Sequence, residues 1–155
     1  MTPQGGFMSS DQAKAIAQRF FDEVCNGRNQ SAADDLFAPT HEYHDPSSPW
    51  VGSGPGGMKQ LTSTYYTAFA DAHWGVDEMI AGDDGTVVTR WTARGTHTAE
   101  LQGLPATGRR VTVQGIWIHR VRDGKIQESW NVWDTLGMLQ QLEVVPKLSS
   151  AAATS

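Results

Sequence analysis

The sequence contains little cysteine and no long apolar run. Cys25 is the only cysteine among 155 residues, which excludes an internal disulfide framework and a zinc site built from thiolates. No stretch approaches the roughly 20 apolar residues of a membrane-spanning helix, and the N-terminus lacks the basic start and apolar run of a signal peptide. We therefore expect a soluble, cytoplasmic protein in which Cys25 is an inert thiol.

Blocks of like charge are also missing. Twelve basic and 17 acidic residues give a net charge of −5, spread along the chain, so neither nucleic acid nor an anionic membrane is an expected partner. The chain has no glycine-rich phosphate loop after a strand and no G-x-S-x-G motif. These absences argue against a phosphate-binding loop and a serine nucleophile of the hydrolase type.

The length fits a single domain, which we place at residues 10–145 between flexible tails at 1–9 and 146–155. Apolar residues at helical spacing predict a helix from about Asp11 to Asn26, ended by Gly27. A short helix at SAADDLF (31–37) and a third beginning near Gly56 follow. The apolar faces of these helices are core by default.

Strands dominate the second half of the chain. Alternation and β-branched residues predict strands at His73–Ala81, in the run Thr86–Leu101, at Arg110–Arg122 and at Ile126–Trp133, with a tight turn at Asp123-Gly124. Helices first and strands last indicate an α+β fold, a curved antiparallel sheet with the helices against one face.

The hairpin GIWIHRVRDGKIQESWNVWD is unusually rich in tryptophan and titratable residues. A two-residue turn at Asp123-Gly124 would place His119 opposite Glu128 and Trp117 opposite Trp130. One face would then carry Trp117, His119, Glu128, Trp130, Val132 and Asp134. Unpaired buried carboxylates are costly, so we interpret this face as the wall of a pocket. A bulge would shift the pairing by one residue and send Asp134 to the other face from His119.

Four stretches carry a family resemblance: HEYHDPSSP at 41–49, TRWTARGTHTAELQGLPATGRRV at 89–111, the hairpin itself, and LGMLQQL at 136–142. From about Gln12 to Leu142 the chain resembles the SnoaL-like polyketide cyclases (ester cyclases) of the NTF2-like superfamily. The resemblance implies an α+β cone, with the sheet wrapped around the N-terminal helices and a central apolar pocket.

The resemblance also implies an activity. Such cyclases close a ring by intramolecular aldol condensation without a cofactor or metal, using an aspartate and a histidine that look to be Asp134 and His119 here. A carboxylate in an apolar surround has a raised pKa and can serve as a general acid/base. The resemblance leaves two alternatives open: epoxide hydrolysis or ring opening, with Asp134 and Arg90 activating water, and a non-catalytic small-molecule-binding protein.

Further residues are candidates for substrate binding, each with a structural alternative. They are His44 and His97 as pocket histidines, Trp50, Trp117 and Trp130 as aromatic walls, Glu128, and Arg90 or Arg94 as an anchor for an anionic group. His41, His44 and Asp45 have a spacing that could ligate metal, but without another matched ligand we predict no metal site. The mixed outer face of the long strands, with Ile116, Ile118 and Trp133, predicts a homodimer.

Overall fold

The computed structural model describes residues 9–148, so the predicted tails lie mostly outside the described part of the chain. The chain begins with helix α1 (Ser10–Arg19), which continues without a break as a π-helical segment, η1 (Phe20–Asn26). Ser9 and Gln12 form a capping box at the start of α1, in which each side chain bonds the other residue's backbone N–H. Gly27 then ends the helix, as predicted.

Two more helices and a strand follow. They are α2 (Ala32–Leu36), β1 (Phe37–His44) and α3 (Gly54–Ala68). Pro55 stands in the first turn of α3, where its missing N–H costs no helical hydrogen bond. Strand β1 begins directly after α2. Its residues do not alternate between apolar and polar side chains, so the sequence pattern gives no strand signal there.

The remaining strands lie where the sequence predicts them. β2 is His73–Ala81, β3 is Thr86–Thr96, β4 is Arg110–Arg122 and β5 is Lys125–Trp133, before a final helix α4 (Thr135–Gln141). The sheet order is β1-β5-β4-β3-β2. Four strands are antiparallel, but β1 pairs with β5 in parallel, so the predicted all-antiparallel sheet is in fact mixed.

The pairing of β4 with β5 differs from the predicted register. Asp123 and Gly124 do form the two-residue turn, both with positive φ, and Arg122 pairs with Lys125. A bulge then follows, because Val121 pairs with Ile126 while Arg120 pairs with Glu128, which leaves Gln127 unpaired. Beyond the bulge, His119 faces Ser129 and Trp117 faces Asn131, so the predicted pairing was one residue out.

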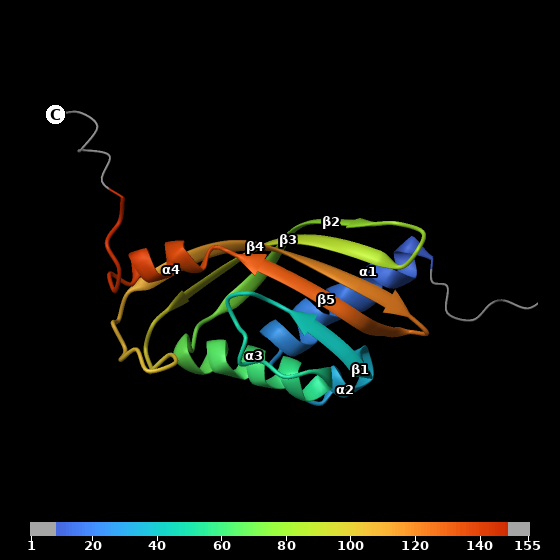
Figure 1. The fold of residues 1–155 in the computed structure, drawn as a ribbon, viewed down its shortest axis with the longest axis horizontal. Helices are drawn as coiled ribbons and strands as arrows, with labels where there is room; N and C mark the ends of the chain where they lie inside the picture. The colour runs from blue at the N-terminus through green and yellow to red at the C-terminus, as the bar shows by residue number, and fades with distance from the viewer. Residues whose placement is uncertain (1–8, 149–155) are drawn as a thin grey trace, which may run out of the picture.

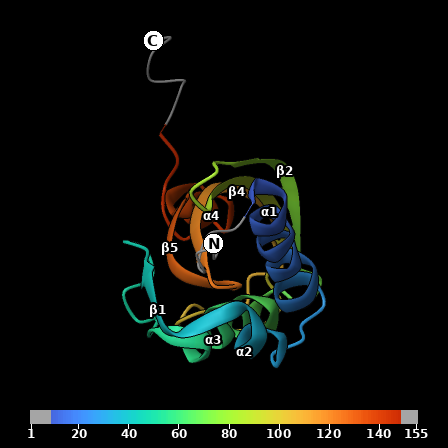
Figure 2. The same cartoon turned by 90° about the vertical axis from the view of Figure 1, so that its right-hand side faces the viewer.

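The core lies inside the curl of the sheet. Figure 1 shows α1 running along the concave side of the strands, and Figure 2 shows the sheet curving around α1 with α2 and α3 closing the open side. Strict alternation of burial along β4 separates an inner face from an exposed outer face. Within residues 9–148, no helix combines the length and apolar character needed to cross a membrane.

Candidate functional site

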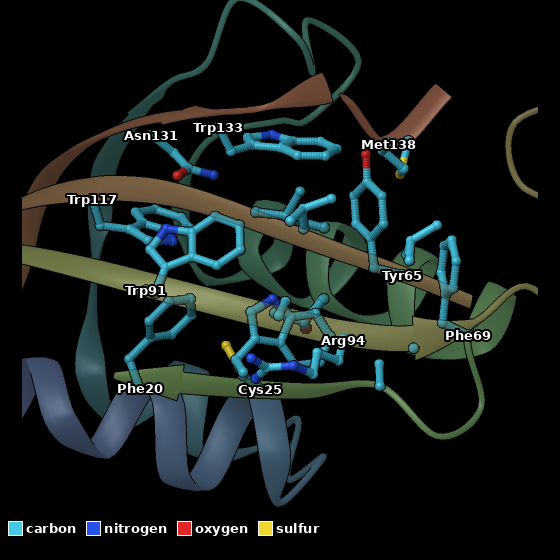
Figure 3. Close-up of a pocket in the computed structure, with 18 residues that line it drawn as sticks. Phe20, Cys25, Tyr65, Phe69, Trp91, Arg94, Trp117, Asn131, Trp133 and Met138 are labelled. Atoms are coloured by element: carbon cyan, nitrogen blue, oxygen red, sulfur yellow. The ribbon is translucent and has the colours of Figure 1, made fainter. Parts of the chain in front are cut away.

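A cavity with an empty volume of about 670 Å³, partly open to solvent, lies between the concave face of the sheet and the helices. The lining comes from the π-helical segment η1, from helices α3 and α4 and from strands β2 to β5. Most of the wall is aromatic (Figure 3), with rings from Phe20, Tyr65, Phe69, Trp74, Trp91, Trp117 and Trp133. Such a wall suits a flat, largely apolar ligand.

Gly115 on β4 makes room for the largest of these rings. A Cβ at this position would lie 2.5 Å from Trp91 Cζ2 and 2.6 Å from Trp133 Cβ. The indole of Trp91 can therefore lie across β4 towards β5 only because residue 115 has no side chain. Gly115 is thus a packing requirement of the cavity wall.

Few polar groups line the cavity. Besides the indole nitrogens, they are the side chains of Thr62, Tyr65, Arg94 and Asn131, and no carboxylate or imidazole is among the described lining residues. Asn131 Nδ2 donates to Tyr43 Oη at 3.3 Å. Tyr43 in turn donates to Asp45 Oδ2 at 2.7 Å, and the Ser47 backbone N–H holds the other oxygen of Asp45 at 2.8 Å.

Burial keeps several of these groups neutral. It raises the pKa of the Cys25 thiol, which is not a thiolate at neutral pH, as predicted for an inert cysteine. It also raises the pKa of the Tyr43 hydroxyl, an effect to which the nearby Asp45 charge adds. Burial raises the pKa of Tyr65 to about 12, so its hydroxyl carries a proton that it can donate.

Two buried histidines lie behind the cavity wall. His119 is 0% exposed and stacks on Trp117, with ring centroids 4.9 Å apart, and neither of its ring nitrogens has a hydrogen-bond partner. His41 Nε2 contacts Ser129 Oγ at 2.9 Å. Burial, with repulsion from His41, lowers the pKa of His119 to about 3, and burial, with repulsion from His44, lowers the pKa of His41 to about 4. Both imidazoles are neutral near pH 7.

Comparison with known proteins identifies the family of this chain. The family model for the SnoaL-like polyketide cyclases matches residues 15–142. The chain belongs to the SnoaL-like polyketide cyclase family. Membership makes this SnoaL-like protein an enzyme of the cyclase type, and confirms the resemblance and the α+β cone predicted from the sequence.

Three relatives illustrate the match. The SnoaL-like protein is 27% identical over 132 residues to the aklanonic acid methyl ester cyclase DauD of Streptomyces sp. (strain C5), covering 82% of this chain and 79% of DauD. It is 30% identical over 120 residues to the aklanonic acid methyl ester cyclase DnrD of Streptomyces peucetius, covering 74% of this chain and 81% of DnrD. A crystal structure from Acidithiobacillus ferrooxidans, described as a candidate polyketide cyclase, superposes with a TM-score of 0.76 at 32% identity. The match covers 88% of this chain and 99% of the Acidithiobacillus chain.

Of the site residues predicted from the sequence of this SnoaL-like protein, Trp117 and the alternative anchor Arg94 line the cavity, and the others do not. The β5 bulge turns Glu128 and Trp130 outward, so their predicted place in the pocket was wrong. His44 is also on the outer face, where it bonds Glu128 at 2.7 Å and stacks on Trp130. Arg120 covers the same Trp130 ring at 4.9 Å from its centroid.

Three other predicted binding residues lie outside the cavity. Arg90 extends from the outer face, where Asp77 and Glu78 pair with it at 3.6 and 3.5 Å. His97 is buried, stacks on Phe69, and accepts the Thr107 backbone N–H at Nδ1, which holds the loop between β3 and β4. Trp50 is partly buried against the core and does not line the cavity.

The structure also separates the predicted catalytic pair. His119 is on the inner face behind Trp117, whereas Asp134 is exposed and caps α4, with its Oδ1 accepting the Gly137 N–H at 2.8 Å. The two residues do not meet in the cavity. The role of Asp134 in proton transfer stays a prediction, and the observed contact is that of a helix cap.

Most of the polar residues that line the cavity were not predicted from the sequence. Asn131 and Tyr65 looked like ordinary strand and helix positions, and Trp91 like part of a β-rich run. Arg94 was considered beside Arg90, and it is the one of the two that lines the cavity. Asn131 could have been found only through the correct hairpin register, since it lies opposite Trp117.

One cluster could hold a metal ion. Ligand atoms of Glu42, His44 and Glu128 lie within 4.8 Å of one another, on the exposed outer face of β1 and β5. The cluster includes His44 of the predicted metal spacing, but neither His41, which is buried, nor Asp45. It lies across the sheet from the cavity, and no other feature of residues 9–148 points to an ion there.

Proposed function

We propose that the protein is a cofactor-independent cyclase that closes a ring of a polyketide-like or polycarbonyl molecule by intramolecular aldol addition. The observation that carries this proposal is the cavity lined by seven aromatic residues in a member of a polyketide cyclase family. An elongated polycarbonyl chain attached to a flat ring system matches such a wall. The substrates named for DauD and DnrD, aklanonic acid methyl ester in both, belong to this chemical class.

The reaction forms one carbon–carbon bond and requires two proton transfers. A carbon between two carbonyl groups loses a proton, attacks a third carbonyl in the same molecule, and the resulting alkoxide gains a proton. No described lining residue is a carboxylate or an imidazole, so the proton leaves the attacking carbon to hydroxide or a buffer base at the open side of the cavity. What the protein supplies is mainly the folded conformation of the substrate, which brings the two carbons into contact.

Tyr65 is our candidate for the group that assists the carbonyl. Its ring meets Trp133 edge-on at 5.6 Å in the cavity wall, and its hydroxyl points towards Met138 of α4 (Figure 3). The raised pKa keeps this hydroxyl protonated, so it can donate a hydrogen bond to the oxygen on which negative charge develops. Asp134 is exposed and His119 has no open path past Trp117, so we assign Tyr65 this role in their place.

Binding without catalysis is the second candidate. It is favoured by the absence of carboxylate and imidazole among the described lining residues. Epoxide ring opening lacks comparable support, because Arg90 is ion-paired on the outer face and Asp134 caps a helix.

The test is to incubate the protein with aklanonic acid methyl ester. Aldol ring closure conserves all atoms, so the product is an isomer of unchanged mass that separates from the substrate by chromatography. Formation of the isomer at a rate proportional to protein concentration supports the cyclase. Saturable binding of the ester without any isomer supports the binding protein instead.

We also propose that the protein forms a homodimer and acts in the cytoplasm. The outer face of the sheet exposes Ile80, Ile116 and Val132, at 57%, 46% and 65%. This face remains available although Trp133, predicted to belong to it, lies in the cavity wall. Ile116 and Val132 are paired across the neighbouring strands β4 and β5, and Ile80 lies on the edge strand β2. Exposed aliphatic side chains on one face of a sheet are typical of a contact surface. The free thiol of Cys25 suits a reducing compartment.

A further inference from the structure

Two polar atoms in the cavity wall have no hydrogen-bond partner. They are Nε1 of Trp91 and Oδ1 of Asn131, on side chains that line the cavity and are 3% and 4% exposed. Buried polar atoms in proteins are nearly always paired, and the exceptions tend to mark functional sites. The other polar atoms of this kind, on His41, His119 and Thr89 among others, belong to residues that do not line the cavity.

The two atoms belong to the same part of the wall. The Trp91 indole lies across Gly115, whose partner on β5 is Trp133. Asn131 is two residues before Trp133 on the same face of β5, and Figure 3 shows its amide beside the two indoles of Trp91 and Trp117. Both side chains therefore belong to one part of the wall, where a bound ligand would lie against Trp91 and Asn131 together.

The orientation of the Asn131 amide follows from its neighbours. The hydroxyl of Tyr43 has one proton, which it donates to Asp45 Oδ2. Its oxygen can then only accept from Asn131, so the amide turns its NH₂ group towards Tyr43 and leaves Oδ1 as an acceptor. The indole nitrogen of Trp91 is a donor only. The wall therefore presents one fixed donor and one fixed acceptor.

We propose that Trp91 and Asn131 select substrates that carry a free hydroxyl or enol group and a carbonyl oxygen on the same ring system. The hydroxyl donates to Asn131 Oδ1 and the carbonyl accepts from Trp91 Nε1. Tyr43 and Asp45 are positioning residues that hold the amide in this orientation without touching the ligand. The inference rests on the proposed function, because it assumes that polycyclic, oxygenated molecules enter the cavity.

A matched ligand pair tests this selection. Anthraflavic acid, a dihydroxyanthraquinone with free phenols, and its dimethyl ether differ only in the hydroxyl protons. Dissociation constants for both are measured from the quenching of tryptophan fluorescence. The wild type should prefer the free phenol by about tenfold, the scale of one hydrogen bond to a buried acceptor. Asn131→Leu should bring this ratio close to one.

Three further variants, one of them a control, separate positioning from packing. Tyr43→Phe removes the acceptor that orients the amide, so the ratio should fall although residue 43 does not line the cavity. Trp91→Phe should weaken both ligands equally, since both keep the carbonyl. Tyr66→Phe removes a phenol hydroxyl outside the cavity and should leave the ratio unchanged. If Asn131→Leu does not fold, the ratio of the two dissociation constants in Tyr43→Phe tests the proposal by itself.

Failure of the ligand selection can be distinguished from failure of the proposed cyclase function. Equal binding of both ligands by the wild type, or a ratio unchanged in Tyr43→Phe, overturns the selection while leaving the proposed cyclase in place. No binding of either ligand overturns both, because the cavity then does not accept oxygenated polycyclic molecules.

Discussion

His119 is completely buried among aromatic rings, next to Phe20, Phe37 and Trp117. Its lowered pKa means that the native state cannot easily take up a proton that the unfolded chain binds near pH 6.5. Between the unfolded and native pKa values the unfolded state binds more protons, so stability falls as the pH falls. The loss begins near pH 6.5 and continues towards pH 3.

We therefore expect His119→Phe to reduce the acid sensitivity of the fold. The free energy of unfolding, measured with urea between neutral pH and pH 4, should fall less steeply in this variant, by up to about 1.4 kcal/mol per pH unit. Phenylalanine preserves the aromatic packing without a titratable group. His73→Phe, at an exposed position, should keep the wild-type slope. An unchanged slope in His119→Phe would mean that His119 is protonated in the native state.

The element scale shows most clearly what the sequence could and could not predict. Strands β2 and β4 and the Asp123-Gly124 turn match the prediction, because alternation and turn chemistry are local signals. The bulge at Gln127 is not local. The Gln127 side chain bonds the Arg122 carbonyl at 2.7 Å within the hairpin, but Lys125, two residues earlier, bonds the carbonyls of Asp34 and Asp35 in α2. These carbonyls are 91 and 90 residues away in the sequence, so only the folded chain provides the contacts.

That single unpaired residue decides which side chains enter the cavity. It exchanges Trp130 and Glu128 for Asn131 and Ser129 on the inner face of β5. It therefore explains why the family and fold were predictable while most of the binding residues were not. The parallel strand β1 could not be predicted for a related reason, because its residues pair with residues of β5 that lie 86 to 89 positions later in the chain.

Helix α4 depends on the Asp134 cap. Its carboxylate approaches Gly137 so closely that a Cβ there would lie 2.1 Å from Asp134 Oδ2. Asp134→Ala should lower the free energy of unfolding by about 1 kcal/mol, and Asp134→Asn should lose much less, because asparagine is also a good N-cap. Urea titration of both variants checks this. Equal losses in the two would show that the charge, and not the cap, stabilises α4.

At the scale of the whole molecule, the sheet separates two functions. Its inner face builds the cavity, while its outer face exposes the aliphatic side chains of the proposed dimer. Val132→Lys places a charge in that face and should convert a dimer into a monomer, as measured by light scattering at micromolar concentration. Thr67→Lys, on the exposed side of α3, is the control and should remain dimeric. A wild type that has only the monomer mass would contradict the dimer.

The central claim is that ring closure takes place in the cavity with Tyr65 assisting the carbonyl. The most direct measurement is the rate of isomer formation from aklanonic acid methyl ester by the wild type and three variants. Tyr65→Phe should be about 10- to 100-fold slower with little change in ligand affinity, since it removes a donor needed mainly in the transition state. Tyr66→Phe and Asp134→Asn should retain the wild-type rate. Full activity in Tyr65→Phe, or loss of activity in a folded Asp134→Asn protein, would contradict the account.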